Sequence, residues 1–301
     1  MLKHTYCKII CSEAHSLGWG YKMSKEVLRV FISVDMEGIS GIVHQSQTGR
    51  DPKEYERGRS LMIGDVNAAI KGVLDFGEAE IVVSDAHGSM RNLKPEELHE
   101  AAVLVSGSPK PLTQMAGIDS EFDAALFIGY HSKKGTKRGI LAHTISSSVI
   151  DSIIINGSEV GETAINAAIA GYHGVPCIFL SGDLAVTKEA EELIPYIVTV
   201  SVKEAFSRTA AKCINPRKAG KLIKQGVTEA LKKRDSIKSF TFNPPIDVKI
   251  KYRDSLMADA VEFIPIVERV NGRTIRFVLN DYLKAFNTLR ASIYVAGAVA
   301  R

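Results

Sequence analysis

Short runs of consecutive apolar residues recur along the first two thirds of the chain, and most end in a polar residue or a glycine. The runs are VLRVFISV, AEIVVSD, AAVLVSG, DAALFIGY and VPCIFLSGD. Strands that are apolar on both faces are typical of parallel sheets with helices on each side. The pattern therefore predicts an α/β fold with a mostly parallel sheet flanked by helices.

The segments between these runs have helical patterns. Residues 51–77 begin with Asp51 and Pro52, a residue pair that favours a helix start, and end at Gly77. Within this segment the apolar residues that share one helix face are Met62, Val66, Ala69, Ile70 and Val73. A second helix, rich in small residues, is predicted over GETAINAAIAGYHG. It follows IIINGSEV, which predicts a short hairpin turning on Asn156-Gly157.

The pattern changes near residue 200. Residues 203–234 are rich in Lys and Arg and have a helical pattern, with Asn215-Pro216 restarting a helix. PPIDVKIKY and IVERVNGRTIRFVLND then read as antiparallel strands, and a final helix is predicted from Tyr282 to about Ala300. We therefore expect an α/β domain over residues 23–200, and this is the domain that we expect to bind metal and carry catalysis. A smaller α+β domain over residues 201–301 would follow, with a possible role in oligomerisation. Residues 1–22 show neither helical nor strand periodicity and are predicted to be an extension outside the fold.

Composition excludes several classes of protein. The chain has 301 residues, 45% of them hydrophobic and 24% charged, with a formal net charge of +4. These values are ordinary for a globular protein, and the basic segment 203–234 carries one aromatic residue, so nucleic-acid binding is not indicated. No apolar run approaches the roughly 20 residues of a membrane span. The four cysteines form no CxxC pair, and free thiols favour a cytoplasmic location.

Chemically active side chains gather where the predicted strands end. Asp35 and Glu37 follow the first strand, His87 follows the second, and His131 follows DAALFIGY. Glu162 begins the helix after the hairpin. Because the carboxyl ends of parallel strands meet along one crevice of an open α/β sheet, these five side chains can converge.

Three carboxylates and two imidazoles suit divalent metal ions. A single zinc site takes three or four such ligands, whereas five, one of them bridging, suit two ions about 3.5–4 Å apart. Ligands without thiolate favour zinc, manganese or cobalt. Each of these residues could instead have no role in metal binding. A carboxylate at a strand end can be solvated or cap a helix, and a histidine after a strand can be a hydrogen-bonded loop residue. Asp85 could orient a ligand or cap a turn, and His143 could be a further ligand, a general acid or base, or a loop histidine.

The ordered motifs resemble one family over most of the chain. They are SVDMEGISG, YERGR, DAHGSMRNL, LFIGYH, AHT, VGETAINAAIAGY and SRTAAKCINPRKAG. The chain from about Leu28 nearly to its end resembles the D-aminopeptidase family, peptidase family M55, whose fingerprint is S-x-D-x-E-G.

The resemblance implies two Zn²⁺ ions per subunit, held by Asp35, Glu37, His87, His131 and Glu162, with Asp35 bridging. It implies that His143 is catalytic, and that subunits form stacked rings, a decamer, whose inner chamber admits short peptides. The expected function is zinc-dependent release of N-terminal (D-)amino acids from short peptides by two-metal amide hydrolysis. Alternatives are another two-metal amidase or phosphoesterase, or a non-enzymatic ring-forming peptide-binding protein.

Overall fold

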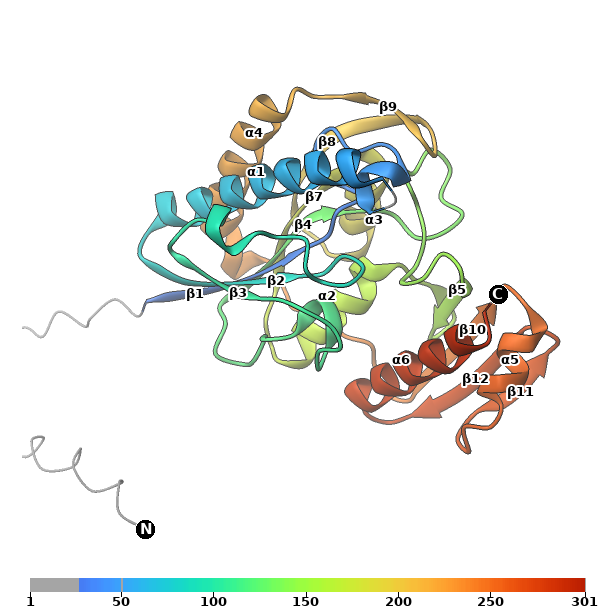
Figure 1. Ribbon diagram of the computed structural model, residues 1–301. Coiled ribbons are helices and arrows are strands. Elements are labelled where there is room, and N and C mark those ends of the chain that lie inside the picture. Colours follow the sequence, from blue (N-terminus) through green and yellow to red (C-terminus); the bar gives the residue numbers. More distant parts are fainter. Residues whose placement is uncertain (1–26, 50, 301) are drawn as a thin grey trace, which may run out of the picture.

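The computed structural model describes residues 27–49 and 51–300, which form two β-sheets with their covering helices (Figure 1). The extension predicted over residues 1–22 lies outside the described residues. None of the helices within the described ranges is both long and apolar enough to span a membrane.

The larger sheet has seven strands in the order β3-β2-β1-β4-β7-β8-β9. They are β1 Leu28–Val34, β2 Ala79–Asp85, β3 Ala102–Val105, β4 Ala124–Tyr130, β7 Cys177–Asp183, β8 Val198–Ser207 and β9 Ala210–Cys213. Neighbouring strands run parallel, except that β9 pairs antiparallel with β8. The predicted fold class is confirmed.

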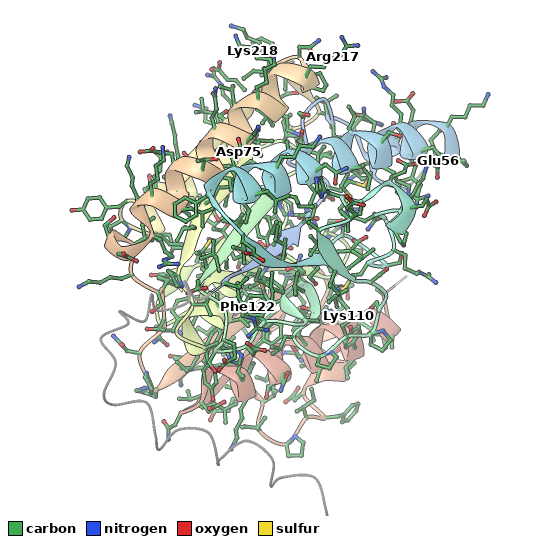
Figure 2. The ribbon with its side chains drawn as sticks, turned by 90° about the vertical axis from the view of Figure 1, so that its left-hand side faces the viewer. Glu56, Asp75, Lys110, Phe122, Arg217 and Lys218 are labelled. Atoms are coloured by element: carbon green, nitrogen blue, oxygen red, sulfur yellow. The ribbon has the colours of Figure 1, made fainter. Side chains whose placement is uncertain are left out.

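Helices cover both faces of this sheet. They are α1 Pro52–Phe76, α2 Glu162–Tyr172, α3 Leu184–Leu193 and α4 Pro216–Lys233, with short 3₁₀ turns η1 Gln45–Thr48, η2 Pro95–Glu97, η3 Thr113–Met115 and η4 Arg234–Ser236. α1 and α4 lie side by side, where Asp75 of α1 pairs with Lys224 of α4 at 2.7 Å (Figures 1 and 2). The predicted start of α1 is confirmed, since the Asp51 carboxylate accepts hydrogen bonds from the first-turn amides of Lys53 and Glu54.

The smaller sheet is antiparallel, in the order β11-β12-β10-β5-β6. Its strands are β5 Ile150–Ile155, β6 Ser158–Glu159, β10 Ile246–Tyr252, β11 Glu268–Asn271 and β12 Thr274–Leu279, and its helices are α5 Ser255–Val261 and α6 Tyr282–Ala298. The predicted hairpin at Asn156-Gly157, the antiparallel strands and the final helix are confirmed.

The helical prediction is wrong over residues 203–213, which form the end of β8 and all of β9. Polar residues spaced three or four apart resemble a helix surface, but pairing with β7 extends the chain and buries Lys203. The domain boundary predicted near residue 200 also does not coincide with the division of the chain between the two sheets. β9 and α4 lie with the larger sheet, and the hairpin of β5 and β6 lies in the smaller one.

The strand order reverses between β1 and β4. From β1 the chain adds β2 and β3 on one side, and from β4 it adds β7 and β8 on the other. Ligands of open α/β sheets bind at the carboxyl ends of the strands beside such a reversal, because the loops there diverge and leave a crevice. Asp35 follows β1 and His131 follows β4, so the fold positions both at this point.

Candidate metal centre

The loop after β1 is held tightly against the end of β4. The Asp35 amide donates to the Ile128 carbonyl at 2.9 Å, and the Gly38 amide donates to the Gly129 carbonyl at 2.8 Å. A Cβ atom at Gly38 would collide with the backbone of Gly129 and Tyr130. The glycine of the S-x-D-x-E-G motif is therefore required by close backbone approach, and it fixes the direction of the two preceding carboxylates.

Asp35 lies between two histidines. Its Oδ1 is 3.3 Å from Nδ1 of His87, and its Oδ2 is 3.3 Å from Nε2 of His131. Glu37 Oε2 is 3.0 Å from the same His87 nitrogen. One carboxylate thus faces both halves of the cluster, which is the arrangement that a bridging ligand needs.

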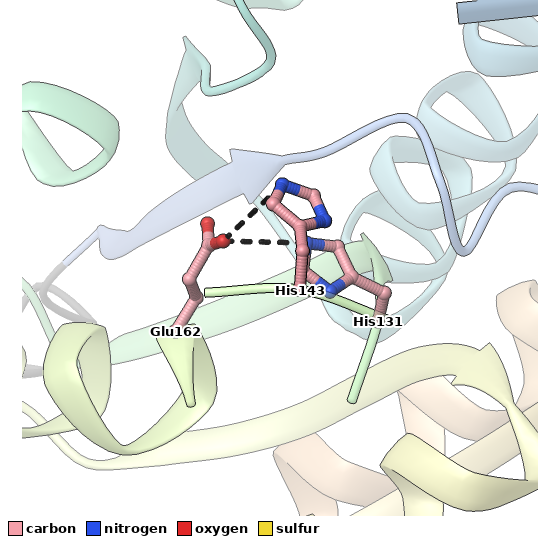
Figure 3. A group of neighbouring side chains, drawn as sticks. All are labelled: His131, His143 and Glu162. Atoms are coloured by element: carbon pink, nitrogen blue, oxygen red, sulfur yellow. Dashed lines mark ion pairs between the residues drawn. The ribbon is translucent and has the colours of Figure 1, made fainter. Parts of the chain in front are cut away.

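Glu162 completes the second half of the cluster. Its Oε1 is 3.3 Å from Nε2 of His131 and 3.8 Å from Nε2 of His143 (Figure 3). The rings of His131 and His143 stack with centroids 4.1 Å apart. The structure therefore brings together all five predicted ligands and His143. Two triplets, His131–His143–Glu162 and Asp35–Glu37–His131, have ligand atoms within 4.8 Å of one another.

Each histidine contacts a backbone carbonyl through one ring nitrogen and a carboxylate through the other. His87 Nε2 is 3.0 Å from the Thr48 carbonyl, His131 Nδ1 is 3.0 Å from the Ser132 carbonyl, and His143 Nδ1 is 3.1 Å from the Leu141 carbonyl. Because a carbonyl only accepts, the nitrogen beside it carries the hydrogen. The other nitrogen is left to face the carboxylates with either a proton or a metal ion.

The donor set fits a divalent metal. Asp35, Glu37, His131 and Glu162 are buried, and Glu37 Oε2 and His131 Nε2 make no hydrogen bond within the described residues. Buried polar atoms without a partner are costly, so these two atoms are suited to coordinate a metal ion. Carboxylate oxygens and imidazoles without thiolate match the ligand preferences of zinc.

Electrostatics within the cluster is strong. Burial opposes charge on Asp35, His87 and His131, but contacts with the opposite charges across the cluster outweigh it. They hold the pKa of Asp35 well below its usual range, and the pKa values of His87 and His131 well above theirs. Burial would likewise raise the pKa of Glu162, but mainly the charge of His131 lowers it to about 2. A metal ion binding between these groups must displace protons from the imidazoles.

Asp85 has a role in a turn. Its carboxylate accepts bonds from the Asn92 amide and side chain and from the Leu93 amide at 2.8 Å. Asn92 Nδ2 also donates to the His87 carbonyl at 2.7 Å. Asp85 therefore closes the turn over residues 87–93 and is linked to the His87 backbone through Asn92.

The loop that carries His143 has an unusual backbone. Arg138, Leu141 and Ile145 have φ angles of 57°, 51° and 59°, in the left-handed region that side chains with a Cβ disfavour. The Ile145 amide donates to Glu162 Oε1 at 2.6 Å. Such strain is concentrated at functional sites, where surrounding contacts enforce it.

Two supporting residues were not identified from the sequence. Gln114 donates to Glu162 Oε2 and accepts from Asn166 of α2. Lys203 is 1% exposed and donates to three carbonyls of the loop after Asp35. Neither belongs to a recognisable spacing, and Lys203 lies in the segment that was predicted to be helical.

Buried carboxylates and imidazoles at the switch point of an open α/β sheet form the kind of site that metal-dependent hydrolases have. A family model described as D-aminopeptidase matches residues 28–291. The D-aminopeptidase of Bacillus subtilis (strain 168) is 37% identical over 263 residues, covering 87% of this chain and 95% of that protein. The chain belongs to the D-aminopeptidase family.

A solved structure agrees with this assignment. It is described as the Zn-dependent D-aminopeptidase DppA from Bacillus subtilis, a self-compartmentalizing protease. It matches with a TM-score of 0.88 and 35% identity, covering 91% of this chain and all of the other. The predicted family is confirmed, and with it the class of enzyme, a metallopeptidase.

Proposed function

We propose that this chain is a zinc-dependent aminopeptidase that releases N-terminal D-amino acids from short peptides with two metal ions per subunit. The observation that carries the proposal is the position of Asp35, whose two oxygens face His87 and His131 separately. The zinc dependence described for the solved relative supports the metal, although manganese or cobalt would fit the same donors.

Five residues would hold the metal ions. Asp35, Glu37 and His87 would bind one, and Asp35, His131 and Glu162 the other. Zinc bound in such a site activates water and polarises the scissile carbonyl. The chain itself fixes the donors before the metal arrives, because carbonyls of Thr48 and Ser132 orient the two imidazoles.

His143 would transfer the proton. Its Nδ1 is held by the Leu141 carbonyl, and its Nε2 faces the cluster 3.8 Å from Glu162 Oε1. This nitrogen is placed to take up a proton and pass it to the leaving amine. The side chain is 16% exposed, so a substrate can reach it.

Paired substrates test the proposal. Zinc-loaded protein is assayed on D-alanyl and L-alanyl p-nitroanilides and on a phosphodiester, bis(p-nitrophenyl) phosphate. We expect turnover of the D-alanyl compound above the L-alanyl one and none of the phosphodiester. Preference for the L-alanyl compound would overturn the stereochemical part, and phosphodiester turnover alone would identify a phosphoesterase. Retention of metal without any turnover would identify a binding protein.

The proposal includes assembly into stacked rings, a decamer by family resemblance, in a cytoplasmic location. Exposed apolar side chains in the smaller sheet, in α5 and in the segment that follows α5 support assembly, because exposed apolar side chains can be buried where subunits meet. They include Phe263, which is 88% exposed, together with Leu256, Ile266, Val270 and Val278. The free cysteines Cys177 and Cys213 support a reducing compartment.

A further inference from the structure

A large cavity has His143 in its lining. Its volume is about 680 Å³, and its lining includes His143, Gln45 and four basic residues. The basic residues are Lys134, Arg138, Arg208 and Arg253. None of the five predicted metal ligands lines it. The cavity is therefore separate from the metal cluster, and His143 is the residue that the two share.

The cavity carries a net positive charge. Asp151 is the one carboxylate in its lining, and this group is already paired with Lys134 at 3.2 Å and Lys251 at 3.0 Å. Arg138 makes neither an ion pair nor a side-chain hydrogen bond within the described ranges of the chain. Its guanidinium is available to an anion.

Two further arginines are tied to the loop that carries His143. Arg208 donates to the Leu141 carbonyl at 3.5 Å, and Arg253 donates to the Ser147 carbonyl at 3.2 Å. A guanidinium has five donors, so one bond leaves most of them free. These contacts fix the positions of the two arginines relative to His143. The basic residues of the cavity are therefore held in a constant position relative to the proposed proton-transfer residue.

We propose that this cavity binds the C-terminal carboxylate of the peptide substrate. This inference rests on the proposed function, in which His143 gives a proton to the leaving amine. The residues beyond the scissile bond must then lie on the His143 side, where the cavity is. In a short peptide the group that always carries negative charge at that end is the terminal carboxylate. Guanidinium groups bind carboxylates through paired, charge-assisted hydrogen bonds.

The consequence is selection by substrate length. A cavity of about 680 Å³ is in the range that holds small ligands, so a carboxylate can reach the arginines when few residues follow the scissile bond. Longer peptides would place their carboxylate beyond the cavity. The enzyme would thus choose short peptides by recognising both termini, in addition to any restriction imposed by assembly.

The test compares D-alanyl-D-alanine with D-alanyl-D-alaninamide, which differ only in the terminal group, a charged carboxylate in one and a neutral amide in the other. We expect the wild-type kcat/KM to be at least about tenfold higher for the acid, since a hydrogen bond to a charged group is worth at least this factor. Added salt should reduce the preference. Arg138→Gln should bring the ratio close to one, and Arg138→Lys should retain part of it.

Arg217→Gln is the matched control. Arg217, labelled in Figure 2, is an exposed arginine at the start of α4 that does not line the cavity, and its replacement should leave the ratio unchanged. Arg253→Gln provides a second variant, measured if Arg138→Gln does not fold by circular dichroism. Equal wild-type rates for acid and amide, or a ratio that neither cavity variant lowers, would overturn the inference and leave the proposed function intact.

If neither compound is cleaved, the proposed function fails and the cavity is tested by binding. Calorimetry with the same two compounds then applies to the zinc-loaded protein. Tighter binding of the acid, lost in Arg138→Gln, would support the carboxylate site. Equal binding of acid and amide would overturn it.

Discussion

The ammonium of Lys203 donates a 2.6 Å hydrogen bond to the backbone carbonyl of Glu37, although 166 positions separate the two residues. It also donates to the carbonyls of Ile39 at 2.8 Å and Ile42 at 2.6 Å. Burial lowers the pKa of Lys203 to about 8, against the opposing charge of Asp183 and other acidic groups. One buried side chain therefore uses all three donors to hold the loop that follows Asp35.

Lys203→Met should weaken metal binding. Methionine has a similar length, but it leaves three buried carbonyls without donors, at a cost of about 1–3 kcal/mol for each unsatisfied group. We expect metal affinity to fall by about 10–100-fold, as when an outer-shell partner is removed, together with a lower Tm. Competition with a coloured chelator measures the affinity. Lys212→Met, at an exposed position of β9, is the control, and equal affinities in the two variants would contradict the role given to Lys203.

Metal content tests the position of Asp35. The wild type should hold close to two divalent ions per chain, and Asp35→Ala should lose more than one, because Asp35 faces both His87 and His131. Glu37→Ala should lose no more than one, since Glu37 faces His87. Elemental analysis gives the stoichiometry. At most trace metal in active wild-type protein, or equal loss in the two variants, would contradict a bridging role.

His143 distinguishes catalysis from metal binding. If it transfers a proton, His143→Ala should retain metal while kcat falls by about 10²–10⁴-fold. His87→Ala should lose metal and activity together. His143 also belongs to a triplet of potential ligands with His131 and Glu162, so the metal content of the variant decides its role. Loss of metal comparable to that in His87→Ala would make His143 a ligand, and near-normal turnover would make it a bystander.

The raised pKa of Asp65 predicts that the free energy of unfolding depends on pH. Burial raises its pKa to about 6, against bonds from the Ser40 amide and hydroxyl, each 2.8 Å, and the charge of Lys203. Between about pH 4 and 6 the folded state therefore binds a proton that the unfolded state has lost, and the free energy of unfolding declines as pH rises. Asp65→Asn cannot ionise and lacks this decline.

Urea unfolding of both proteins between pH 4 and 7 measures this effect. The wild-type free energy of unfolding minus that of Asp65→Asn should decrease with rising pH by up to about 3 kcal/mol, and should level off above pH 6. The difference between the two proteins cancels pH effects that they share, including metal release. A difference that is constant with pH would show that Asp65 titrates alike in both states.

Assembly is tested on the apolar surface near α5. Light scattering of the wild type should report a species many times the chain mass of 32.8 kDa. Phe263→Glu should yield smaller species, because a buried charge in an interface is costly. Val103→Glu changes an apolar residue of β3 that is 66% exposed, and serves as a comparison. A monodisperse and active wild-type monomer would remove the case for a compartment.

The sequence by itself determined the strands and the residue types at their ends. Runs such as AEIVVSD and DAALFIGY have short apolar centres rich in Ile, Val, Leu and Phe, a pattern typical of buried parallel strands, and these segments form β2 and β4. The order of motifs from SVDMEGISG onward was sufficient to predict the family. The convergence of Asp35, Glu37, His87, His131 and Glu162 followed from the rule that parallel strands end along one edge.

Tertiary structure decided what depends on contacts between distant segments. Lys203 lies in a polar stretch that resembles a helix surface, and pairing of β8 with β7 is what extends this stretch and aims the ammonium at the loop after Asp35. Arg138, Arg208 and Arg253 are unremarkable surface residues in sequence, and folding alone collects them around His143. Local patterns report which face of an element is apolar, whereas the partners of a single charged side chain depend on which elements pack together.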